Sequence, residues 1–159
     1  MPDQKPSRTA GDERATLQDL LQYHRTSIVG KVRGISDEEA RSSPVPSGTS
    51  LLWLLRHLTY AEAIWVLDRF DGQGSAVVPP NRSEPDDTVE AAVAAYRAMW
   101  AQVDAVVAEA DSLDELCRAN DHRDPTDLRW VLAHLLEETA RHAGHADIIR
   151  ELLDGQTGR

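Results

Sequence analysis

The stretch LLWLLRHLTYAEAIWVL, residues 51–67, is apolar on almost every side of a helical projection. A surface helix has one apolar face, whereas a helix that is apolar nearly all round must be covered by other elements. The stretch therefore predicts a central helix, which we expect to run from Ser50 to about Phe70.

Three further segments, residues 13–33, 87–110 and 127–154, repeat apolar side chains at helical spacing, and no strand pattern competes with them. Gly34 and Gly155 are suited to end the first and the last of these helices. The chain is thus predicted to be all-α, a four-helix bundle over residues 13–159, preceded by a polar, mobile tail at residues 1–12.

The connections are predicted from capping pairs and from residues that break helices. Ser36 with Glu39 predicts a short capped turn, and Asp87 with Glu90 predicts the start of the third helix. Residues 71–87 and 111–126 are rich in Gly, Pro and Asp, so we expect long loops between the second and third helices and between the third and fourth. Loops of this length in a small domain are often functional.

Composition excludes several classes of partner. The chain has 17 basic and 27 acidic residues and a net charge of −10, which argues against nucleic acid and anionic membrane surfaces. No apolar run approaches the length that spans a membrane. Cys117 is the single cysteine, and the N-terminal residues lack the apolar segment of a secretion signal, so we expect a cytoplasmic protein.

A row of polar side chains, here called the stripe, runs along one side of the last predicted helix. In HLLEETARHAGH, residues 134–145, the side chains of His134, Glu138, His142 and His145 recur at helical steps. With His134 at zero, Glu138 projects at about 40°, His142 at about 80° and His145 at about 20° on a helical wheel. All four therefore lie on one side of the helix.

The same side of this helix carries apolar residues, Val131 and Ile149 at about 60° and Leu152 near zero, so we expect the stripe to face into the bundle. An uncompensated carboxylate there would cost several kcal/mol or become neutral. A divalent cation would compensate it, because imidazole and carboxylate are common metal ligands.

His57 offers a further ligand from the central helix, on the apolar face that carries Leu54, Ala61 and Ile64. One His from this helix and the Glu138–His142 pair would form a three-ligand site with positions left for water or substrate. Two other interpretations stay open: a buried polar network without metal, and a stripe whose face has been misassigned.

The stretches SGTSLLWLLRHLTYAEAIWV and LRWVLAHLLEETARHAGHADIIRELLDGQTGR resemble the DinB-like superfamily, in particular its actinobacterial branch of small proteins. Many relatives carry three His at four-residue steps in the last helix, and the second and third bind metal with a His of the second helix. The resemblance implies that Glu138, His142 and His57 are the ligands. Glu replaces the second His here, as in the related mycothiol-dependent maleylpyruvate isomerases. His145 stands where Gln is usual, so His145, like His134, is a candidate fourth ligand or a neighbour of the ligands.

The resemblance also implies an activity, since several superfamily members are S-transferases that use mycothiol, bacillithiol or glutathione. By that analogy we expect a divalent metal, Zn²⁺ first and Ni or Fe as alternatives, that activates mycothiol to attack an electrophilic small molecule. Two alternatives remain: a metal-dependent hydrolase that uses metal-bound hydroxide, and a non-catalytic metal-binding stress protein. A homodimer is compatible with the apolar second helix.

Three further residues are candidates for the walls of a pocket. His24 lies on the apolar side of the first helix, where an ordinary buried His is the alternative interpretation. Tyr60 could contact a metal-bound His. Trp65 projects about 80° from His57 on the same helix and is the Trp that we expect nearest to the pocket.

Overall fold

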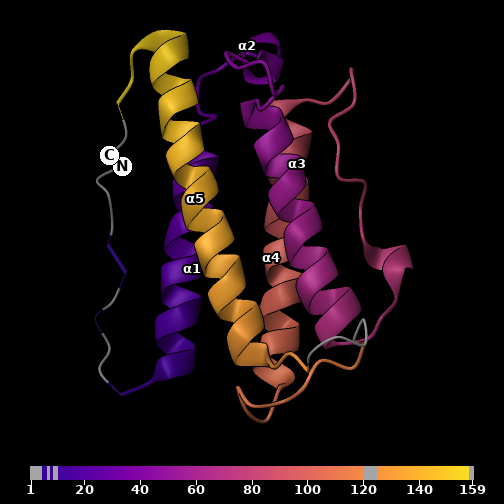
Figure 1. Cartoon of the computed structure of the whole chain (residues 1–159). Coiled ribbons are helices and arrows are strands. Elements are labelled where there is room, and N and C mark those ends of the chain that lie inside the picture. The colour runs from indigo at the N-terminus through magenta and orange to yellow at the C-terminus, as the bar shows by residue number, and fades with distance from the viewer. Residues whose placement is uncertain (1–4, 7, 9–10, 120–124, 158–159) are drawn as a thin grey trace.

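The computed structural model describes all residues except 1–4, 7, 9–10, 120–124 and 158–159. Four long helices form a bundle, and two short helices lie in the connections (Figure 1). The elements in chain order are α1 (Glu13–Gly30), α2 (Asp37–Arg41), α3 (Leu51–Glu62), η1 (Ala63–Phe70), η2 (Ser75–Val77), α4 (Val89–Glu109) and α5 (Leu128–Asp154). The all-α four-helix bundle predicted from the sequence is confirmed.

The directions in which the helices run explain why the loop between η1 and α4 is long. Arg14 at the start of α1 donates a hydrogen bond to the carbonyl of Ala110, just after α4, whereas Lys31 after α1 pairs with Asp147 near the end of α5. α1 and α5 therefore run in one direction and α3 and α4 in the other (Figure 1). Since α3 and α4 are parallel, residues 71–88 must return along the whole length of α3 before α4 can begin.

Side-chain caps begin the helices largely where the sequence placed them. Ser50 accepts a hydrogen bond from the amide of Trp53, Asp127 caps α5, and Ser36 forms the predicted capping box with Glu39. The prediction of Asp87 as the cap of α4 is wrong, because Thr88 takes that role. α1 ends at Gly30, three residues before the predicted Arg33.

The second long helix differs from the prediction in its last third. It is α-helical to Glu62 and continues as the π-helix η1 to Phe70. The backbone amide of Asp71 accordingly bonds to the carbonyl of Val66, five residues earlier. π-helical segments are rare in proteins, and those that do occur are often found at functional sites.

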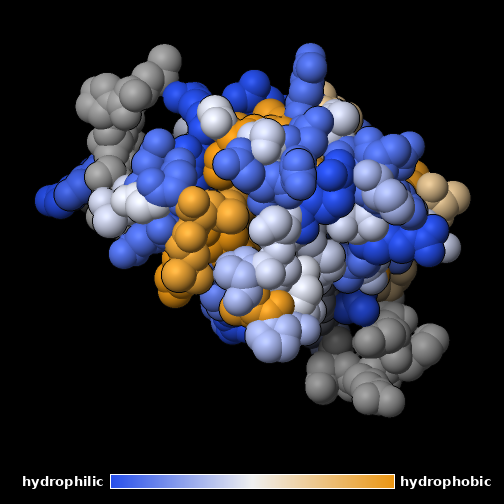
Figure 2. Space-filling view, turned by 90° about the horizontal axis from the view of Figure 1, so that it is seen from above, coloured by the Kyte–Doolittle hydropathy of each residue, from blue (hydrophilic) through white to orange (hydrophobic). Residues whose placement is uncertain are grey.

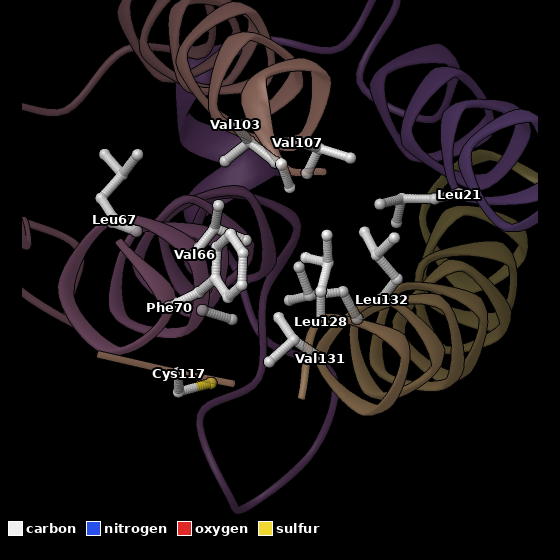
Figure 3. Close-up of a cluster of buried hydrophobic side chains, with 14 of the residues drawn as sticks. Leu21, Val66, Leu67, Phe70, Val103, Val107, Cys117, Leu128, Val131 and Leu132 are labelled. Atoms are coloured by element: carbon white, nitrogen blue, oxygen red, sulfur yellow. The ribbon is translucent and has the colours of Figure 1, made fainter. Parts of the chain in front are cut away.

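The core has two apolar clusters with a charged pair between them. Figure 3 shows one cluster, in which side chains from α1, η1, α4 and α5 point toward a common centre and Cys117 lies at the edge. The other cluster includes Ile28, Leu55 and Ile149. Between them, the fully buried Arg25 donates two hydrogen bonds to the buried carboxylate of Glu62, at 2.9 and 2.6 Å.

The face of the molecule seen in Figure 2 is mostly hydrophilic, with separate apolar areas. Ile148 and Leu152 are exposed near the end of α5, at 60% and 63%. The prediction that Leu152 faces the core is therefore wrong. None of the described helices is both long enough and apolar enough to cross a membrane.

Candidate metal centre

Three side chains from two antiparallel helices meet at one point. The Nε2 atom of His57 on α3 lies 2.8 Å from Oε1 of Glu138 on α5. The Nε2 atom of His142, one turn further along α5, lies 3.2 Å from the same oxygen. One ligand atom from each residue lies within 4.8 Å of the others. The structure thus brings together the three residues that the sequence indicated.

The helical projection of α5 accounts for the depth of three of the four stripe residues. The exposed fraction of the side chain falls from 25% at His134 to 17% at Glu138 and 10% at His142, in the order of their projection angles. His145 is exposed. The stripe therefore lies at the rim of the buried face and not at its centre, so the expectation that it faces into the bundle is only partly right. A site at this rim can be reached from solvent.

Aromatic packing holds the two imidazole rings in place. Trp53, one turn before His57, stacks on its ring at 4.8 Å between centroids and 6° between planes. Trp53 also meets the His142 ring edge-on, and the two imidazoles are nearly perpendicular, at 83°. These contacts direct both Nε2 atoms at Glu138.

The far nitrogen of each ring has its own partner. Nδ1 of His57 lies 3.0 Å from Oδ1 of Asn81, which belongs to the connection between η1 and α4. Nδ1 of His142 lies 3.2 Å from Nδ1 of His145. Histidines that bind metal in proteins almost always have such a partner on the second nitrogen, because it fixes the tautomer and the ring orientation.

The charge states of Glu138 and His142 suit a cation. Burial raises the pKa of Glu138, but its contact with His57 and the nearby imidazoles outweigh burial, so the pKa lies below its ordinary value. Burial lowers the pKa of His142, more than Glu138 raises it. At neutral pH the carboxylate is thus ionised and the imidazole of His142 is neutral, the forms that bind metal.

The donor set also fits a divalent ion chemically. Two imidazole nitrogens and one carboxylate oxygen are the ligand types found in three-ligand zinc sites. Nε2 of His57 and Nε2 of His142 both face Oε1 of Glu138, so a cation placed between these atoms could bind all three. Among the described residues, this trio is the group that could hold an ion.

His134 and Trp65 lie together in a second aromatic cluster. His134 stacks on Trp130 at 4.9 Å and 16°, and Trp65 meets the His134 ring at 4.7 Å. A shallow hollow of about 230 Å³ lies over α5 between Trp130 and Glu137 and is lined in part by His134. This cluster is one turn of α5 before Glu138.

His24 and Tyr60 are not in the group that converges on Glu138. The His24 ring packs edge-on against Tyr23 on α1, and the next residue, Arg25, is the one that is buried. Tyr60 is half-buried on α3. Their proposed pocket roles remain predictions.

Two features of this region escaped the sequence analysis. Asn81 had no signal other than its position in a long loop of the kind that is often functional. Arg25 shares the apolar spacing of Leu21 and Ile28, which could have indicated a buried charge that needs a partner.

Cys117 is buried, which raises the pKa of its thiol and keeps it protonated.

The chain resembles known proteins in sequence and in fold. The family model described as mycothiol-S-transferase matches residues 16–155. Among solved structures, a conserved protein from Enterococcus faecalis superposes with a TM-score of 0.66 at 15% sequence identity, over 89% of this chain and 96% of that one. A likeness at this identity supports the fold alone. A comparison with curated proteins finds no match.

Proposed function

Because the chain belongs to the mycothiol-S-transferase family over residues 16–155, we propose that it is a divalent-metal-dependent S-transferase that uses mycothiol. The observation that carries the proposal is the meeting of His57 Nε2, His142 Nε2 and Glu138 Oε1 at one solvent-accessible point. We assign these three side chains as the metal ligands.

Each ligand has a separate task in this proposal. Glu138 supplies the negative charge, and the two imidazoles complete a set that leaves further positions open. His145 is exposed and faces the far nitrogen of His142, so we assign it as the partner that orients His142 and not as a fourth ligand. Trp53 covers one face of the His57 ring and excludes water from that side.

A bound cation such as Zn²⁺ would supply the positive charge that lowers the pKa of a thiol placed beside it. The thiol gives its proton to solvent, and its sulfur forms a bond to an electrophilic carbon. The bond from that carbon to its leaving group breaks, and the leaving group departs with the electron pair. The three ligands lie at the rim of the bundle, where both reactants can reach them.

The test is a transfer assay with mycothiol and chlorodinitrobenzene, which releases chloride and forms a coloured thioether. The zinc-loaded protein should exceed the protein-free rate, most clearly near neutral pH, because free alkyl thiols with a pKa of about 8.5 are then mostly protonated. Glutathione is the comparison thiol, and we expect it to react more slowly.

His57→Ala and Glu138→Gln should both lose the acceleration. His134→Ala is the matched control, since it removes an imidazole one turn from Glu138 whose ring packs on Trp130. Hydrolysis of an ester or amide in the absence of any thiol, with no thiol transfer, would replace the proposal with a hydrolase.

A further inference from the structure

We infer that Asn81 is a positioning residue for the metal centre: its side-chain oxygen holds His57 in the orientation and tautomer that a cation requires. The inference rests on the proposed metal site, and it adds a loop residue to a centre otherwise built from α3 and α5. Residues 71–88 would then be part of the site as well as a connection.

The first step is the hydrogen-bond geometry. Oδ1 of an amide only accepts, so its contact with Nδ1 of His57 at 3.0 Å requires the hydrogen on Nδ1. A neutral imidazole with that hydrogen presents its lone pair at Nε2. That nitrogen is the one that faces Glu138 and His142.

The second step is that the other contacts of His57 do not place the hydrogen of the ring on Nδ1. Trp53 fixes the plane of the ring by stacking, but stacking leaves the ring free to be protonated at either nitrogen. Glu138 approaches Nε2 and, without a cation, attracts the hydrogen to the wrong nitrogen. In the structure, Nδ1 of His57 donates its hydrogen bond to Oδ1 of Asn81.

The third step is that the chain holds Asn81 in place. Residues 71–88 return along α3 because α3 and α4 are parallel (Figure 1). The contact of Asn81 with His57 shows that the loop reaches this residue. Pro79 and Pro80 directly before Asn81 restrict the backbone.

The end of the loop is clamped to the same helix. The carboxylate of Asp87 accepts two hydrogen bonds from Arg56, the residue just before His57. Arg41 donates to the backbone carbonyl of Asp87 at 2.7 Å. The loop segment that carries Asn81 is thus anchored at Asp87, through hydrogen bonds to Arg56 and Arg41.

The experiment measures zinc affinity of the purified full chain by competition with a chromophoric chelator. Asn81→Ala should weaken binding by about 10- to 100-fold, the effect of losing an orienting partner. Asn81→Asp keeps an acceptor and should restore most of the affinity. Arg82→Ala is the matched control, because Arg82 is the next loop residue and pairs only with exposed Glu84 in the described structure; it should leave zinc affinity unchanged.

A second readout is the His57 Nδ1–H resonance in the zinc-loaded protein. In ¹⁵N NMR it should be protected from exchange in the wild type and exchange rapidly in Asn81→Ala. Wild-type affinity in Asn81→Ala would overturn the inference and leave the metal site standing. Equal losses in Asn81→Ala and Asn81→Asp, or a loss in Arg82→Ala, would also overturn it. A wild type that binds no zinc would overturn the metal site itself.

Discussion

A single oxygen, Oε1 of Glu138, receives both imidazoles of the candidate centre, at 2.8 and 3.2 Å. Without an ion, each imidazole can bond to this oxygen only through a hydrogen on Nε2. In the proposed function, a divalent ion between the three atoms would take the place of these hydrogens and bind the carboxylate directly.

Replacing either imidazole should abolish tight zinc binding. We expect His57→Ala and His142→Ala to weaken affinity by more than about 100-fold, since even the loss of an orienting neighbour costs 10- to 100-fold. His134→Ala should bind zinc as the wild type does, because its ring packs against Trp65 and Trp130. Isothermal titration of the three variants measures this, and equal affinity in His57→Ala and wild type would rule out the assigned site.

At the scale of elements, the buried pair of Arg25 on α1 and Glu62 on α3 joins two helices at the start of η1. Burial raises the pKa of Glu62, and Arg25 opposes that rise. Glu62→Ala would leave the guanidinium buried with only the half-exposed Asp104 as an anionic partner, at 2.9 Å. We expect a loss of about 3–5 kcal/mol in the free energy of unfolding, measured by urea denaturation.

Asp104→Ala is the control for the buried pair. It removes the exposed partner of Arg25 and keeps the buried one, so it should cost no more than about 1 kcal/mol. A similar loss in both variants would show that the buried geometry adds nothing to an ordinary ion pair.

The clamp at Asp87 should depend on pH. The hydrogen bonds from Arg56 lower the pKa of Asp87, so the folded protein holds this carboxylate ionised at lower pH than the unfolded chain does. Its stabilisation is present above the unfolded pKa of about 3.9 and is lost as pH falls through the folded value. Asp87→Ala should lose about 1–3 kcal/mol at neutral pH. The difference from wild type should shrink below about pH 4. Glu84→Ala, an exposed neighbour, should change stability by less than about 0.5 kcal/mol at any pH.

The elements were predictable to different degrees, for physical reasons. Caps such as Ser50 and Asp127 act through backbone amides two or three residues away, so the sequence shows them directly. His57, Glu138 and His142 were found because helical spacing fixes which side chains share a face. Asp87 does not cap α4, because its carboxylate accepts a hydrogen bond from Arg56, which lies 31 residues earlier in the sequence. The π-helix and the Asn81 contact also depend on tertiary partners, which local spacing does not encode.

For the whole molecule, the proposed metal joins α3 to α5, two neighbouring helices that run in opposite directions (Figure 1). A ligand that binds only the folded state stabilises it in proportion to the logarithm of its concentration over Kd, about 4 kcal/mol at a thousandfold excess. Since 1 kcal/mol shifts the melting temperature of a chain this size by about 2–4 °C, saturating zinc should raise it by about 10 °C.

Thermal melts followed by circular dichroism test this stabilisation. The metal-free protein should melt at lower temperature than the zinc-loaded one, and adding zinc back should reverse the difference. His57→Ala should melt at the same temperature with and without zinc, because two ligands from α5 alone cannot tie that helix to α3. An unchanged melting temperature after confirmed removal of zinc would mean that the ion does not brace the bundle. A zinc-dependent rise that persists in His57→Ala would place the stabilising ion elsewhere on the chain.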